Sequence, residues 1–172
     1  MTASISARGL PGSAPDRAIP DFLAAFYRAY LSRDETLLQQ ILHDDVEWLL
    51  MGPADQLDIY GRRNGKAETI ELITRIMPCY FEILDFEFEH LLVDGQRVAA
   101  YGRVRARQRE TGRALCFRGA HFLRFENGKL MSFRSMADTF DLVEQVVGHP
   151  IDITKRVERI PLVPEEDALL IV

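Results

Sequence analysis

Cysteine, histidine and long apolar runs are scarce in this sequence, and each scarcity removes a class of protein. Two cysteines, Cys79 and Cys116, in 172 residues provide neither a disulfide framework nor a CxxC metal motif. The four histidines, at positions 43, 90, 121 and 149, do not follow a metal-ligand spacing. No apolar run is long enough to span a membrane. We therefore expect no metal, no cofactor and no membrane partner.

Positive charge is also limited. The formal net charge is -5 and the pI is near 5.4, which argues against a nucleic-acid partner. Residues 1–19 are small and polar and lack the apolar segment of a secretory signal, so we expect a disordered segment and a cytoplasmic protein. Residues 20–148 form one expected domain. Residues 149–172 form an extension whose apolar end, from Ala168 to Val172, we expect to lie on the body or on a partner, with disorder as the alternative.

Helical spacing and capping residues predict a helical first half with one strand in it. Pro20-Asp21 opens a helix with an amphipathic stripe, and Asp34 caps a second, short helix. Val46 to Met51 reads as a strand, because Val46, Trp48 and Leu50 share one face. Gly65 precedes a third helix, which a proline at position 78 ends or kinks.

The second half, from about residue 84 to residue 138, predicts four successive antiparallel strands. Apolar and charged side chains alternate along it, which is typical of a sheet with one buried and one exposed face. Asp94-Gly95, Thr111-Gly112 and Asn127-Gly128 supply the turns. A short helix ending at Gly148 follows, and Asp138 is better placed to cap it than to serve as a pocket carboxylate.

Strand registers follow from requiring buried residues to face one another. They place Phe86 opposite Val104, Phe88 opposite Gly102, and charged pairs on the outer face. A tight Thr111-Gly112 turn then sets His121 opposite Gly102. A bulge at the glycine of the last turn sends Phe133 and Ser135 inward, with Phe133 beside His121. The glycines at positions 102 and 119 are expected to leave room around the His121 ring. His90 is also expected to face inward, in a structural role.

Several short motifs are distinctive: Asp45-Val46-Glu47-Trp48, Gly52-Pro53, Tyr60-Gly61, Gly65-Lys66-Ala67-Glu68, the run from Ala120 to Lys129, Phe133-Arg134 and Asp138-Thr139. Together they resemble SnoaL-like polyketide cyclase domains of the nuclear transport factor two-like superfamily. The resemblance covers residues 21–148. It implies an α+β fold, a cone-shaped curved antiparallel sheet wrapped by three or four helices, as in a cystatin-like roll.

The catalytic sets of two related enzyme groups are not retained. At the positions where ketosteroid isomerases carry an aspartate base and two oxyanion donors, this chain has Leu50, Phe26 and His121. The Asp-Arg-Asp set of limonene-epoxide-hydrolase-like enzymes and its water-holding residues correspond to apolar or small residues here. The corresponding positions are Gly102, Val104 and Ser135 for the set, and Trp48 and Leu50 for the water.

His121 is the one candidate catalytic residue, because its ionisable ring is predicted to face the middle of the cavity. It could act as a general acid/base or donate a hydrogen bond to an oxyanion, and the alternative is a structural histidine. The expected pocket lining comprises Phe26, Tyr27, Trp48, Leu50, Phe86, Phe88, Gly102, Val104, Phe133 and Ser135.

Together these residues predict an apolar pocket for a small hydrophobic molecule, carbonyl-bearing or cyclic. One hypothesis is a cofactor-independent isomerase, cyclase or hydrolase that uses His121. The other is a non-catalytic ligand-binding or dimerisation module that has lost its acid/base residues. Arginines on the outer face, with Arg105 opposite Arg118 in the predicted register, further suggest a homodimer whose second subunit supplies carboxylates to that face.

Overall fold

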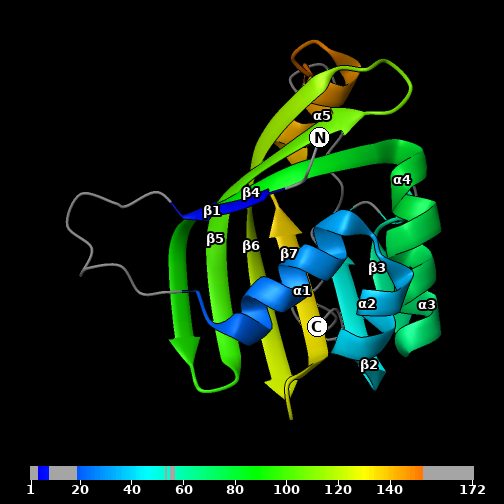
Figure 1. The fold of residues 1–172 in the computed structure, drawn as a ribbon. Helices are drawn as coiled ribbons and strands as arrows, with labels where there is room; N and C mark the ends of the chain where they lie inside the picture. Colours follow the sequence, from blue (N-terminus) through cyan, green and yellow to red (C-terminus); the bar gives the residue numbers. More distant parts are fainter. Residues whose placement is uncertain (1–3, 8–18, 53, 55–56, 153–172) are drawn as a thin grey trace, which may run out of the picture.

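The computed structural model describes residues 4–7, 19–52, 54 and 57–152, and it confirms an α+β fold in which helices wrap one curved sheet (Figure 1). Seven strands lie in the order β1-β4-β5-β6-β7-β2-β3. The strands are β1 (Ser4–Ala7), β2 (Leu42–Met51), β3 (Gly61–Asn64), β4 (Phe81–Asp94), β5 (Arg97–Gln108), β6 (Ala114–Glu126) and β7 (Lys129–Ala137). The helices are α1 (Asp21–Ser32), α2 (Glu35–Ile41), α3 (Lys66–Glu71), the π-helical η1 (Leu72–Ile76), α4 (Met77–Tyr80) and α5 (Thr139–Val147).

Local capping formed as the sequence predicts. The Asp34 carboxylate accepts a hydrogen bond from the Leu37 amide at 3.1 Å, and the Asp138 carboxylate accepts one from the Asp141 amide at 3.1 Å. Gly148 ends α5 in the left-handed conformation, at φ 85°. None of the helices in the described ranges is long and apolar enough to cross a membrane.

The sheet is mixed rather than purely antiparallel. The β4–β7 strands form the expected antiparallel meander, but β2 pairs with β7 in parallel and β1 pairs with β4 in parallel. The chain leaves β2 and passes through helices and four further strands, β3 to β6, before it returns as β7. Such a long crossover is what a parallel neighbour requires.

Strand β1 corrects the prediction of disorder for residues 4–7 of the N-terminal segment. Ser4–Ala7 pairs with β4 between Asp85 and Phe88. The free edge of β4 offers unpaired backbone N–H and C=O groups, and an added strand satisfies them. Residues 1–3, 8–18 and 153–172 lie outside the described residues, as does the apolar end of the extension.

The β4–β5 register agrees with the prediction where it was drawn and departs from it beyond a bulge. Phe86 faces Val104 and Phe88 faces Gly102, but the register shifts between Phe88 and His90. One extra residue on β4 reverses the side-chain alternation. His90 is therefore exposed, and its predicted inward direction is wrong.

The next register is displaced by two residues from the prediction. His121 faces Ala100 rather than Gly102, because the β5–β6 connection is longer than a two-residue turn. The Gln108 amide donates to the Arg113 carbonyl at 2.9 Å, and four residues lie between them. An even displacement preserves the inward direction of His121, since side chains alternate with a period of two.

Phe133 and Ser135 of the last hairpin point inward as predicted, but the extra residue that causes this direction lies at a different position from the predicted one. Its turn has two residues with positive φ, Asn127 at 49° and Gly128 at 76°. The extra residue lies further along β7, where the register shifts between Arg124 and Phe125. His121 thus lies opposite Ser135 instead of Phe133.

Candidate ligand pocket

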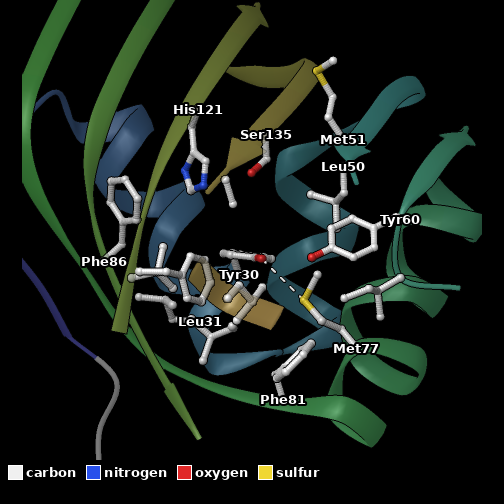
Figure 2. Close-up of a pocket in the computed structure, with 16 residues that line it drawn as sticks. Tyr30, Leu31, Leu50, Met51, Tyr60, Met77, Phe81, Phe86, His121 and Ser135 are labelled. Carbon is white, nitrogen blue, oxygen red and sulfur yellow. Dashed lines mark hydrogen bonds between the residues drawn. The ribbon is translucent and has the colours of Figure 1, made fainter. Parts of the chain in front are cut away.

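An apolar cavity of about 80 Å³ lies between the concave face of the sheet and the helices at one end of it. Figure 2 shows His121 and Ser135 on the sheet side, with Tyr60, Met77 and Phe81 across the space. The cavity is lined by Tyr30, Leu31, Leu50, Met51, Ile59, Tyr60, Met77, Phe81, Ile83, Phe86, Val104, Phe117, His121, Ser135, Ala137 and Leu142.

The His121 ring packs against three aromatic rings, those of Tyr27, Phe86 and Phe133. It stacks on Phe86, with ring centroids 4.5 Å apart, and on Tyr27 at 5.9 Å. The Tyr27 hydroxyl lies 2.7 Å from His121 Nδ1. The side chain is 7% exposed, and burial lowers the pKa of His121 from its ordinary 6.5 to about 3. The imidazole is therefore neutral at physiological pH.

The hydrogen bond to Tyr27 assigns the tautomer of this ring. Burial raises the pKa of Tyr27, so its hydroxyl keeps a proton, and His121 Nδ1 is its one partner within the described part of the chain. If Nδ1 carried the proton, the buried phenol O–H would have no acceptor, which costs about 1–3 kcal/mol. Tyr27 therefore donates to Nδ1, and the ring proton sits on Nε2.

Nε2 is open to the cavity. It makes no hydrogen bond among the residues that the structure describes. Nε2 also keeps some accessible surface. In those residues Trp48 Nε1 is the only side-chain nitrogen or oxygen that is both fully buried and without a hydrogen-bond partner, so the unpaired Nε2 is not fully buried. His121 thus presents one N–H donor to whatever occupies the cavity.

The remaining polar groups of the lining are neutral hydroxyls. Ser135 lies opposite His121 on the next strand. The Tyr30 hydroxyl donates to Met77 Sδ at 3.5 Å, and burial raises the pKa values of Tyr30 and Tyr60. The lining contains no Asp, Glu, Lys or Arg, and no group of three metal-ligating side chains occurs in the described ranges. This environment suits an uncharged ligand.

The structure brings together about half of the residues expected around the pocket. His121, Leu50, Phe86, Val104 and Ser135 lie on the cavity. The others are packed behind its wall. Those not on it are Phe26, Tyr27, Trp48, Phe88, Gly102 and Phe133.

The aromatic residues behind the wall form solid core. Trp48 and Phe133 stack with ring centroids 3.9 Å apart, and both are fully buried. Tyr27 touches His121 from this side, so it acts on the pocket through that ring.

Gly102 does not hollow the sheet as predicted. A side chain at this position would overlap the backbone carbonyl of Glu87 on β4. The bulge brings β4 close to β5 at this point, and only glycine leaves space for it. Gly119 lies opposite Gly102 instead of opposite Val104, where we expected it.

Six lining residues from outside the strands were missed by the sequence prediction: Tyr30, Leu31, Ile59, Tyr60, Met77 and Leu142. Tyr30 follows Phe26 at helical spacing, and that spacing was the available signal. Tyr60, Met77 and Leu142 come from a loop and two short helices, and only tertiary packing brings them to the cavity.

Three arginines of the outer face, at positions 103, 105 and 118, pair with carboxylates of the same chain, so these three do not need carboxylates from a partner. Arg105 pairs with Asp85 at 2.8 Å. Glu89 lies 3.4 Å from Arg103 and 3.2 Å from Arg118, so one carboxylate intervenes between two opposed arginines. The predicted homodimer itself stays a prediction.

A curved, unclosed sheet wrapped by helices is the fold of the NTF2-like class of α+β domains. Within that class, the family model of the SnoaL-like domain matches residues 23–133. The chain belongs to this family.

Solved structures support the assignment. A proposed isomerase from Rhodopseudomonas palustris is 31% identical, with a TM-score of 0.70, over 77% of this chain and 100% of that one. An NTF2-like protein of unknown function from Burkholderia pseudomallei K96243 is 23% identical, with a TM-score of 0.64, over 74% and 98%. A limonene-epoxide-hydrolase (LEH)-like epoxide hydrolase of M. tuberculosis is 17% identical, with a TM-score of 0.60, over 74% and 87%, and shows a shared fold. Among proteins of curated function, none matches the chain.

Proposed function

We propose that the cavity binds a small, uncharged and mostly apolar molecule through one hydrogen-bond acceptor, such as a carbonyl oxygen. The observation that carries this proposal is the neutral His121 ring, whose Nδ1 is occupied by Tyr27 and whose Nε2–H is available to the cavity. In apolar surroundings, a ligand that offers an acceptor to this N–H donor should bind much more tightly than one without an acceptor. The reason is that no water replaces the hydrogen bond when the acceptor is missing.

The cavity volume limits the ligand. Its 80 Å³ is about half of the roughly 150 Å³ cavity that holds benzene. A ring of five or six atoms therefore requires side chains to move. Met51 and Met77 line the cavity and are flexible and unbranched, so they are the side chains most easily displaced.

A second candidate function is an isomerase, favoured by the 31% identity to the Rhodopseudomonas palustris protein. In this role the His121 Nε2–H would polarise a carbonyl and stabilise the enolate formed by loss of an α-proton. A neutral ring with a pKa of about 3 is a weak base, so it supports the donor role rather than the proton-shuttle role. The described lining supplies no carboxylate base for the α-proton, which places simple binding first.

A ketone and its hydrocarbon isostere test the binding role. Cyclopentanone and methylenecyclopentane have nearly the same shape, and ligand-observed NMR titration gives a Kd for each. We expect the wild-type protein to prefer the ketone by about tenfold, the worth of one hydrogen bond of about 1.4 kcal/mol. His121→Phe keeps an aromatic ring without the N–H and should abolish the preference, while the exposed His90→Phe should retain it. Equal affinities in the wild type, or no binding of either compound, would refute the proposal.

The same ketone separates the two candidate functions. Exchange of its α-protons for deuterium in D₂O, followed by NMR, reports enolate formation. Binding without accelerated exchange identifies a binding module. Accelerated exchange that His121→Phe removes identifies carbonyl polarisation by this residue and puts the isomerase first.

A further inference from the structure

The outer face of the sheet carries a second concave feature, on the side of the sheet opposite to the His121 ring. It is a groove of about 610 Å³ across the ends of β4, β5, β6 and β7. It is lined by Leu92, Val93, Asp94, Arg97, Val98, Ala99, Phe122, Leu123, Arg124, Ser132 and Arg134.

Two adjacent cross-strand rows form the groove. One row begins with apolar residues, because Leu92 faces Ala99 and Ala99 faces Phe122, and it ends at Arg134, which faces Phe122 on β7. Leu92 is 70% and Phe122 is 46% exposed, and these two large apolar side chains lie on the strands to either side of Ala99. The neighbouring row runs through Asp94, Arg97, Arg124 and Ser132, so that Arg97 lies between a carboxylate and a second arginine.

The positive charge of the groove is only partly compensated. Asp94 is the one carboxylate in the lining, and Glu126 lies 3.5 Å from Arg124. No ion pair involves Arg97 or Arg134 among the residues that the structure describes. The groove therefore suits a partner that combines negative charge with apolar side chains.

Residues 165–172 of this chain have that composition. Glu165, Glu166 and Asp167 are followed directly by the apolar residues Ala168 to Val172. These residues lie outside the described part of the chain. We propose that residues 165–172 dock in this groove of their own chain, with the acidic triplet against the arginines and the apolar residues against the exposed row.

The length of chain makes this docking feasible. Helix α5 is tied to one end of β6, where the Gln145 amide bonds both the N–H and the C=O of Cys116 at 2.8 and 2.7 Å. The groove at Phe122 lies six residues further along β6, about 20 Å away at a strand rise of roughly 3.4 Å per residue. Residues 153–164 number twelve and reach about 40 Å when extended. A short tether also gives an effective concentration on the order of millimolar, which favours the groove of the same chain.

Disulfide trapping in the full chain tests the proposal. Native cysteines are first replaced, as Cys79→Ser and Cys116→Ser. Ala99→Cys then places a thiol in the groove, and Leu170→Cys places one in the segment. Under mild oxidation we expect a disulfide within one chain, formed at least tenfold faster than in a matched pair with Gln39→Cys, an exposed position on α2.

Charge reversal makes the test specific. Arg97→Glu with Arg134→Glu should slow trapping at position 99 at least tenfold, and adding Glu165→Lys with Glu166→Lys should restore it. Circular dichroism establishes that each variant is folded, and the restored variant excludes a folding defect as the cause. Equal rates at positions 99 and 39, insensitivity to charge reversal, or a product of dimer size would each overturn the proposal, the last by assigning the groove to a second copy.

Discussion

Lowering the pH should destabilise this protein through His121, by an amount that the structure determines. The folded-state pKa of about 3 lies below the ordinary 6.5 that the ring regains on unfolding. Above pH 6.5 both states are neutral and the ring contributes nothing to the pH dependence. As the pH falls from 6.5 toward 3, the His121 imidazole becomes protonated in the unfolded chain but stays neutral in the folded chain. The free energy of unfolding therefore decreases through this window.

The expected size of the effect follows from the two pKa values. Between about pH 7.5 and pH 5, protonation of the unfolded chain at this one residue costs about 2 kcal/mol of stability. By about pH 4 the loss reaches roughly 3 kcal/mol. Such losses are a large share of the stability of an ordinary domain.

Urea unfolding at pH 7.5 and at pH 5 measures this difference directly. His121→Gln removes the titrating ring and still offers Tyr27 an acceptor, so its stability should fall by about 2 kcal/mol less than that of the wild type between the two conditions. His90→Gln, at an exposed position on β4, is the matched control and should follow the wild type. If His121→Gln and the wild type lose the same stability, the inferred burial and neutrality of His121 are wrong.

Two further predictions concern stability and use the same unfolding assay. Gly102→Ala should cost about 3 kcal/mol, because the new methyl group overlaps a backbone carbonyl of β4 that cannot move freely. Gly119→Ala, whose methyl group would meet its closest neighbour at 3.2 Å, should cost less than half as much. Equal losses in the two variants would show that the bulge does not require a glycine at position 102. Asp138→Ala should cost about 1 kcal/mol by removing the cap of α5, whereas Asp138→Asn should retain most of the stability. An unchanged midpoint in Asp138→Ala would mean that α5 is held by other contacts.

Local features could be predicted from the sequence because their causes span only a few residues. The caps at Asp34 and Asp138 depend on an amide three residues further on, and the positive φ values at Gly95, Gly112 and Gly128 depend on the turn itself. The inward direction of His121 also follows locally, because a strand alternates its side chains. The family resemblance added the order of the elements.

Tertiary structure decided everything that depends on how distant segments meet. Turn length and bulges set which residues face His121, and these depend on contacts between strands rather than on either strand alone. The parallel pairing of β2 with β7 and the position of the cavity beside α4 and α5 required the whole chain to close. The tautomer and the low pKa of His121 belong to this second group, since both arise from burial against Tyr27 and Phe86, which lie 94 and 35 positions before it in the sequence.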